Sequence, residues 1–230
     1  MFAVIERGKM VITRIVVLCL MLLLIPACDK ANNQPSEDIY PWQIILLSDG
    51  KTRVFGITLN ESTLNDAVTI LGRNYKLGLF ETPDQPLSLE IYFNEVTLGG
   101  ISGKFVLTLE ATQEELKILR QQAIKREVLE SGARRYTLTA ETNDALTQKR
   151  ITSLSYIPYI NLDEEIIRKR FGEPTERVVV DQKRQHLLYP EFGLDLLLDE
   201  EGKELLQYVD PAEIEQLRQP LIKKKTSEKS

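Results

Sequence analysis

The chain has 230 residues, of which 43% are hydrophobic and 27% are charged, so it can bury a core of ordinary size. Its formal net charge is −5, and residues 1–27 hold three basic residues against one acidic residue, so the remainder is more acidic still. Because a nucleic-acid-binding protein needs a basic surface, this balance argues against nucleic acid as a partner.

Two cysteines restrict the chemistry of the chain. Cys19 lies inside an apolar run near the N-terminus, and Cys28 comes shortly after that run. If the run is removed on export, Cys28 becomes the first residue and no cysteine follows it. The folded body then contains no disulfide, no catalytic thiol and no thiolate metal site.

An apolar run of eleven residues, Ile15–Ile25, directly follows Arg14. A membrane-spanning helix needs about 20 apolar residues, so this run is too short to span a bilayer. A basic residue before a short apolar run is typical of a secretory signal peptide, and we expect residues 1–27 to be removed. Translation could begin at Met1 or at Met10, and both starts give the same mature protein.

The end of the signal peptide, Ile25-Pro26-Ala27-Cys28, resembles the lipobox of bacterial lipoproteins. That pattern has an aliphatic residue three positions before the cysteine and a small residue directly before it; Pro26 departs from the small residue usual at its position. The resemblance implies that Cys28 carries fatty acids such as palmitate, which together anchor a protein stably in a membrane. The domain would then lie in the periplasm or otherwise outside the cytoplasmic membrane. Asp29 resembles the inner-membrane retention signal of enterobacterial lipoproteins, which favours the inner membrane slightly.

Four segments follow the signal peptide. Residues 28–41 are polar and contain two prolines, which is typical of a flexible tether after the acylated cysteine. Residues 42–132 and 133–219 are expected to form two α+β units, and residues 220–230 form a charged tail.

The first unit is expected to begin with a β-hairpin. Asp49-Gly50 supplies the turn between the runs 42–47 and 52–59. Further strands are expected at about 75–82, 88–96 and 103–110.

Two helices are expected in the same unit. Apolar residues at helical spacing predict a helix over 62–71, with Ser62 capping its start and Gly72 its end. The capping-box pattern Thr112–Glu115 opens the longest helix, which is expected to continue to about residue 129.

The second unit alternates strands with short helices. Strands are expected at 135–139, 151–157, 177–180, 185–189, 193–198 and 205–209. Helices are expected over 143–149, from Asn161 or Asp163 to Gly172, and from Asp210-Pro211 to about Leu217.

Gly72 and Gly172 each close a short helix that precedes strands, which suggests two repeated helix-then-meander units. The segments Arg170–Pro174, Leu188–Pro190 and Gly193-Leu194 of the second unit resemble BamE/SmpA-like lipoprotein modules. That resemblance implies an accessory role in envelope protein assembly. The expected fold class is α+β, with mainly antiparallel sheet and helices packed on one face.

Motifs that could carry catalysis have simpler structural interpretations. The single histidine, His186, lies in an alternating strand without the partners of a hydrolase or metal motif, and is expected to be a surface or half-buried residue. The segment Gly99–Lys104 looks like a phosphate loop but lacks its first glycine and its final hydroxyl residue, so a hairpin turn is expected. The acidic clusters Asp163–Glu165 and Asp199–Glu201 are expected to be a helix first turn and a hairpin turn. No catalytic residue, metal or cofactor is therefore expected.

Basic residues gather in the middle of the chain, at Arg120, Lys125, Arg126, Arg134 and Arg135. One interpretation is the solvated face of the long helix; the other is a docking patch for an acidic partner or for lipid headgroups. The expected function is that of a non-enzymatic interaction or assembly domain, lipid-anchored in the cell envelope and binding an envelope protein. The alternative is a tethered binder of a small or lipidic ligand in a pocket between the two units.

Overall fold

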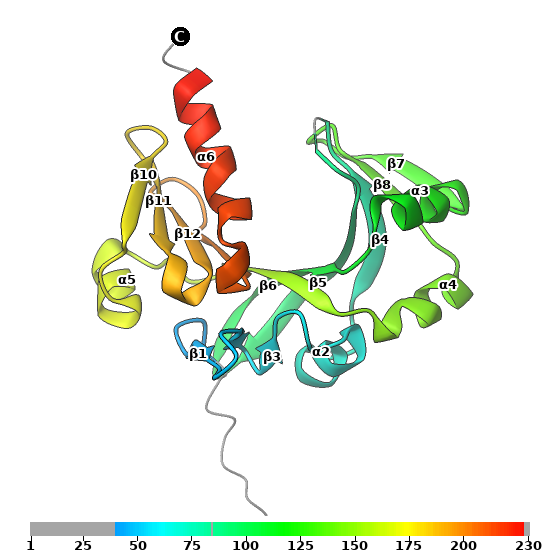
Figure 1. Cartoon of the computed structure of the whole chain (residues 1–230), viewed down its shortest axis with the longest axis horizontal. Helices are drawn as coiled ribbons and strands as arrows, with labels where there is room; N and C mark the ends of the chain where they lie inside the picture. Colours follow the sequence, from blue (N-terminus) through cyan, green and yellow to red (C-terminus); the bar gives the residue numbers. More distant parts are fainter. Residues whose placement is uncertain (1–39, 84, 228–230) are drawn as a thin grey trace, which may run out of the picture. The chain divides into compact units, whose positions relative to one another are not determined.

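The computed structural model describes residues 40–83 and 85–227, with side chains as far as residue 222 (Figure 1). The predictions on the signal peptide, on Cys28 and on most of the tether lie outside the described residues. Within the described part of the chain, no helix has both the length and the apolar character needed to cross a bilayer.

Ten antiparallel strands form one continuous sheet, which confirms the predicted α+β class with antiparallel pairing. From one edge to the other, its strands are β10 (Glu176–Val179), β11 (Arg184–Tyr189), β12 (Leu194–Asp199), β13 (Leu205–Val209), β9 (Ile151–Pro158), β6 (Ile101–Leu109), β5 (Ser88–Leu98), β4 (Lys76–Glu81), β8 (Arg134–Thr137) and β7 (Lys125–Val128). The pairing of β6 with β9 joins the two expected units in a single sheet. Gly99 and Gly100, both with positive φ, make the predicted hairpin turn between β5 and β6.

Alternation of buried and more exposed side chains along the central strands places one face of this sheet in the core. In β9, for example, Leu154 and Tyr156 are buried whereas Ser153 and Ser155 are partly exposed. Alternation of this kind places every second side chain in the core. Figure 1 shows β1 to β3 and α2 on one side of the central strands, and α6 beside β10 to β12.

A small three-stranded sheet at the N-terminal end packs on that core through Phe55. Its strands are β1 (Ile45–Leu46), β2 (Thr52–Val54) and β3 (Ile57–Thr58). The expectation of one strand over 52–59 was wrong, because Phe55 and Gly56 take φ of 54° and 75° and turn the chain between β2 and β3. The turn inserts the Phe55 ring among three core aromatic rings, those of Phe105, Tyr156 and Tyr208.

Two contacts tie this N-terminal end to the last strands of the chain. The Tyr208 hydroxyl, which is fully buried, donates a hydrogen bond of 2.8 Å to the Pro41 carbonyl. The Thr52 hydroxyl donates to the Phe192 carbonyl at 3.0 Å. Both contacts join residues at opposite ends of the sequence, so the N-terminal and C-terminal regions share one core.

Short helices α2 (Leu64–Leu71) and α5 (Glu164–Phe171) have closely similar ends. Gly72 and Gly172 close them with φ of 92° and 86°, as predicted. Asp163 caps α5, whereas the cap of α2 is Thr63 and not Ser62. Thr63 forms a reciprocal capping box with Asp66, while the Ser62 hydroxyl accepts a hydrogen bond from the Thr58 amide.

The length predicted for the longest helix was wrong. Helix α3 covers Gln113–Gln121 and stops after its last core residue, Leu119. The Ile124 amide then donates to the Thr137 carbonyl and starts the edge strand β7. Lys125 and Arg126 therefore lie on a strand and not on a helix.

The remaining elements are short, apart from the last helix. They are α4 (Ala140–Ala145), the 3-10 turns η1 (Leu146–Gln148), η2 (Pro190–Phe192) and η3 (Pro211–Glu213), and α6 (Glu215–Ser227). Helix α6 runs past the predicted end at Leu217 and through Pro220. Its Arg218 bonds to Glu176 of β10 at 2.7 Å, a contact that the sequence pattern did not indicate.

Candidate functional site

The five basic residues singled out in the sequence come together at the β7 end of the large sheet. Arg120 lies on α3, Lys125 and Arg126 on β7, and Arg134 and Arg135 on β8. Because β7 and β8 pair antiparallel, four of them lie within one two-stranded ribbon. We call these five residues the cationic surface.

Glu81 of β4 holds one half of the cationic surface in place. Its carboxylate accepts hydrogen bonds from Arg120 at 2.8 Å, from Arg134 at 3.3 Å and from the Tyr136 hydroxyl at 2.6 Å. The hydrogen bond from Tyr136 lowers the pKa of Glu81 most, and the two guanidinium groups lower it further. One carboxylate thus fixes two arginines from different elements, and one of the two positive charges is left in excess.

Glu127 of β7 holds the other half. Lys125 reaches it at 2.5 Å, and the Arg135 guanidinium donates from Nε at 3.1 Å and also from Nη2. Since side chains alternate along a strand, this group lies on the opposite face of β7 from Arg126. No ion pair joins Arg126 to a described carboxylate. Five cations therefore meet two bound carboxylates.

The pKa of Glu127 provides a direct check of this arrangement. The hydrogen bond from Lys125, and then that from Arg135, lowers it to about 2 from its usual 4.5. Because the folded-state pKa is depressed, the stabilisation by these contacts is complete above pH 4.5 and is lost as the pH falls toward 2. We expect a carboxyl NMR titration to give a midpoint near pH 2 for Glu127, and a higher midpoint in Lys125→Ala. Equal midpoints in the two proteins would show that the contact is absent in solution.

Exposed apolar side chains flank the cationic surface. Ile124 is 68% exposed, Val128 is 65% exposed and Ile118 of α3 is 54% exposed, and these are three of the four most exposed large hydrophobic residues among those described. A surface that combines arginine with exposed aliphatic side chains resembles the composition of protein interfaces.

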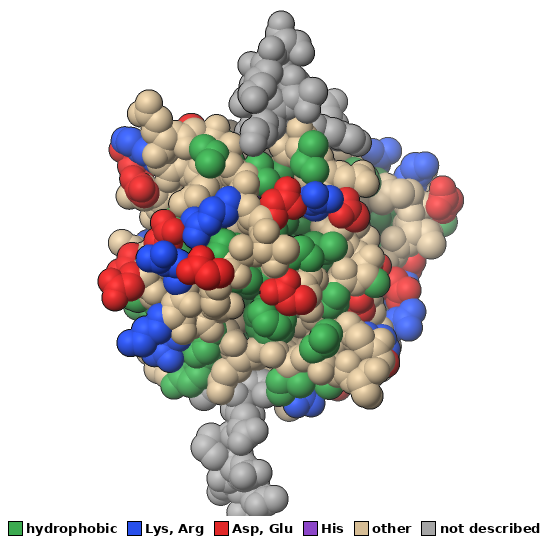
Figure 2. All heavy atoms as spheres, turned by 60° about the vertical axis from the view of Figure 1, so that its left-hand side comes forward, with side chains coloured by type: hydrophobic (Ala, Val, Ile, Leu, Met, Phe, Trp, Pro, Cys, Tyr) green, Lys and Arg blue, Asp and Glu red, His purple; other side chains and the backbone are tan. Residues whose placement is uncertain are grey.

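The opposite end of the sheet has balanced charge. Figure 2 shows the side that carries β10, β11 and α5, where basic and acidic side chains lie next to one another. Arg177 bonds to Glu164 at 2.9 Å, and Arg218 bonds to Glu176 at 2.7 Å. Positive and negative charges therefore balance on this side, whereas the cationic surface has an excess of positive charge.

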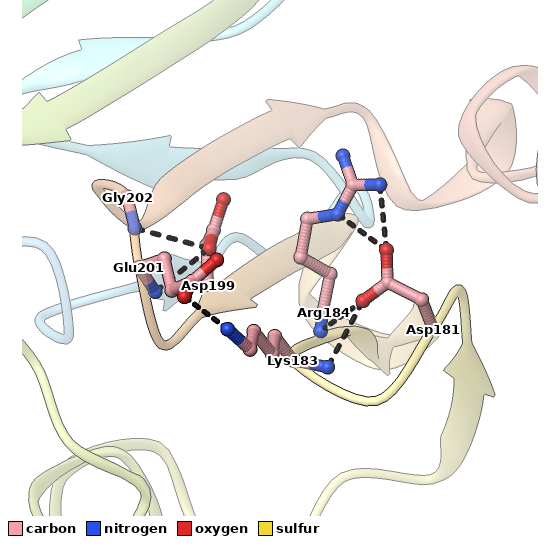
Figure 3. A network of polar contacts seen from close by, with 6 residues as sticks. All are labelled: Asp181, Lys183, Arg184, Asp199, Glu201 and Gly202. Carbon is pink, nitrogen blue, oxygen red and sulfur yellow. Dashed lines mark hydrogen bonds and ion pairs between the residues drawn. The ribbon is translucent and has the colours of Figure 1, made fainter.

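The acidic clusters have the structural roles that the sequence predicted. Asp163 caps α5. At the tips of two hairpins, Asp199 accepts hydrogen bonds from the Glu201 and Gly202 amides, and Asp181 accepts from the Lys183 and Arg184 amides (Figure 3). An ion pair between Lys183 and Glu201 joins the two tips. These carboxylates are occupied in shaping turns.

His186 is largely buried, with 12% of its side chain exposed, and its Nδ1 lies 2.9 Å from both carboxylate oxygens of buried Asp195. The sequence did not predict this partner, because a diagonal pair on neighbouring strands leaves no signal in spacing. No hydroxyl group among the described residues hydrogen-bonds to His186. Among the described residues, no group of three or more potential ligands could hold a metal ion.

A pocket of about 280 Å³ lies where β4, β5, β8 and α4 meet, and sequence reasoning missed it. Its lining includes Tyr75, Lys76, Phe80, Tyr92 and Arg135. The Phe80 and Tyr92 rings pack 5.2 Å apart, and the Tyr92 hydroxyl donates to Glu90. The pocket is thus small and mixed in polarity, and several of its polar groups are already paired.

No family model, no curated protein and no solved structure matches this chain. The geometry of the described residues is therefore the basis for any functional assignment.

Proposed function

We propose that the protein is a lipid-anchored, non-enzymatic interaction domain of the bacterial cell envelope, which docks an acidic surface of an envelope protein through its cationic surface. One observation carries the proposal: five basic side chains from three elements lie at one end of the sheet, with Arg120, Arg126 and Arg134 on one face and Lys125 and Arg135 on the other. Among the described residues, two carboxylates, Glu81 and Glu127, bind four of them. Exposed Ile124 and Val128 lie beside these charges and can add apolar contacts to the interface with a partner.

The anchor belongs to the same proposal. Acylation at Cys28 would hold the domain at the membrane on the outer side of the cytoplasmic membrane, and Asp29 favours the inner membrane. A tethered domain meets other envelope proteins at a raised effective concentration, so a docking surface of modest affinity is sufficient. An accessory role in envelope assembly agrees with the resemblance of the second unit to BamE/SmpA-like modules.

The alternative function, binding of a small or lipidic ligand between the two units, has one observation in its favour. The pocket combines Tyr75 and Tyr92 from the first expected unit with Arg135 and Asn143 from the second. Its volume of about 280 Å³ lies just below the usual range for ligand sites, and its lining is not predominantly apolar. The cationic surface is therefore the better-supported site.

Charge reversal at Arg126 tests the docking function. Arg126 has no described carboxylate partner, so Arg126→Glu leaves the Glu81 and Glu127 contacts in place while lowering the surface charge by two. We expect copurification of the partner from cross-linked cells to fall at least about tenfold, equivalent to about 1.4 kcal/mol. The matched control is Lys104→Glu on β6, an exposed lysine outside the cationic surface, which should leave recovery unchanged. Equal recovery of the partner with both variants would contradict docking at this surface.

A further inference from the structure

Gly78 lies in the interior of strand β4 and lines the pocket where β4, β5, β8 and α4 meet. Its φ lies outside the left-handed region, so the backbone conformation does not require a glycine. A Cβ built on Gly78 would lie 3.4 Å from Cγ of Arg135 and 3.4 Å from Cε2 of Phe80, and both of these side chains line the pocket. Glycine weakens the interior of a strand and often marks the close approach of a ligand. The missing side chain therefore keeps this part of the pocket open.

The pocket lies where strand β8 leaves strand β4. Pairing between these two strands stops at Leu79 opposite Tyr136, whereas pairing of β4 with β5 continues to Lys76 opposite Tyr92. After β8 the chain enters α4, which supplies Asn143 to the lining. The opening is thus built into the path of the chain, between residues 76–78 and α4.

Several polar groups of the lining remain available to a ligand. The Asn143 amide makes no hydrogen bond to any described residue, and its Oδ1 is buried. Because it has no bond to lose, this amide can turn about its last side-chain bond and offer a ligand its oxygen or its nitrogen. Arg135 binds Glu127 through Nε and Nη2, which leaves Nη1 for another acceptor. Lys76 is exposed and forms no ion pair with a described carboxylate.

Aromatic rings form the apolar part of the lining. The Phe80 and Tyr92 rings lie 5.2 Å apart and are tilted by 44°, and the Tyr75 ring lies 5.6 Å from the ring of the core residue Phe93. Rings held in this way offer fixed apolar surfaces against which a flat molecule can pack.

We propose that this pocket binds a small aromatic carboxylate. The ring of the ligand packs on Tyr75 and Tyr92, its carboxylate binds Nη1 of Arg135 and the Lys76 ammonium group, and a polar substituent reaches the Asn143 amide. No acidic residue lines the pocket, so the two cations favour a negatively charged ligand. The volume of about 280 Å³ suits a compound with a single ring rather than a lipid. This site goes beyond the proposed docking function and depends neither on it nor on the lipid anchor.

Saturation-transfer difference NMR with para-hydroxybenzoate tests the proposal on the purified full-length protein. This probe combines one ring, one carboxylate and one hydroxyl group, and we expect a dissociation constant on the order of 1 mM for a ligand of its size. Gly78→Ala places a methyl group in the pocket and should reduce the ring-proton signal at least fivefold. Absence of a signal with the wild-type protein would overturn the proposal.

A charge variant keeps the test decisive if Gly78→Ala disturbs folding. Lys76→Gln changes an exposed side chain and should reduce the signal at least threefold. The matched control is Lys169→Gln on α5, which is also exposed and lies at the other end of the sheet, and which should leave the signal unchanged. Equal signals from these two variants would reject binding at this pocket.

Two further probes test the proposed orientation of the ligand. The neutral compound para-hydroxybenzamide keeps the ring but lacks the charge, and should give a signal at least fivefold weaker than para-hydroxybenzoate; an equal signal would reject the carboxylate contact. Benzoate lacks the hydroxyl group that would reach Asn143. Asn143→Ala should therefore weaken binding of para-hydroxybenzoate and leave binding of benzoate unchanged, whereas an equal loss for both probes would reject the contact with Asn143.

Discussion

Gly193→Ala is expected to lower the free energy of unfolding by about 3 kcal/mol or more. Gly193 follows η2 in the left-handed conformation, with φ 63° and ψ 31°. A Cβ there would lie 2.0 Å from the Val209 carbonyl oxygen and 3.0 Å from the Pro211 amide nitrogen. Both atoms belong to the backbone, and the Val209 amide also donates to the Gly193 carbonyl at 2.9 Å, so neither segment can move away without breaking β-sheet contacts.

Urea denaturation of purified protein measures this loss. Gly132→Ala is the matched control, because Gly132 also has a positive φ of 81° but no atom lies within 4 Å of a Cβ built on it. The free energy of unfolding of the control should fall only by the cost of holding an alanine in the left-handed conformation, about 1–2 kcal/mol. Similar losses in the two variants would show that the close approach between Gly193 and Val209 is absent in solution.

Cys28→Ser is expected to abolish attachment of fatty acid to the chain. A serine cannot form the thioether that the lipobox resemblance implies. Metabolic labelling of cells with palmitate, followed by immunoprecipitation, measures the change. The matched control is Cys19→Ser, since Cys19 lies in the segment expected to be removed and its loss should leave the labelling unchanged.

Mass spectrometry of the membrane form adds an independent readout. The wild-type protein should begin at Cys28 and carry the added mass of its acyl chains. A wild-type chain with residues 1–27 intact, or a Cys28→Ser variant that still incorporates palmitate, would contradict the lipoprotein assignment.

Sequence pattern predicted most strands because the central strands of the sheet bury one face in the core. The prediction of 205–209 coincides with β13, since Leu206 and Tyr208 alternate with less buried neighbours. The helix that ends at Gly172 was predicted, with its start at Asn161 or Asp163, because residues that can cap both of its ends are present in the local sequence; the structure places the start at Asp163.

The two largest errors in the fold arose where local pattern allowed two structures. The apolar spacing of Leu116 and Leu119 continued through Ile124, which predicted one long helix over a segment that in fact holds α3, a turn and β7. Pairing of β7 with β8 decides this segment, and a partner strand does not appear in local spacing. The turn at Phe55 was missed because a phenylalanine with positive φ is uncommon.

The candidate site was predicted in part. Its five basic residues were selected from the sequence, but their placement on a helical face was wrong for Lys125 and Arg126. Glu81, which fixes Arg120 and Arg134, lies 39 and 53 residues away from them in the chain. The buried Asp195 beside His186 was missed for the same reason, since its proximity depends on the register between β11 and β12.

The hydrogen bond between Tyr208 and Pro41 spans 167 residues, and it affects how the protein is made. A chain is synthesised from its N-terminus, so Pro41 and Phe55 emerge long before the strand that completes their packing. The early part of the chain must therefore keep apolar side chains exposed until synthesis is nearly complete. Folding of such long-range contacts is slow, and a chain truncated before β13 should be a substrate for chaperones and proteases.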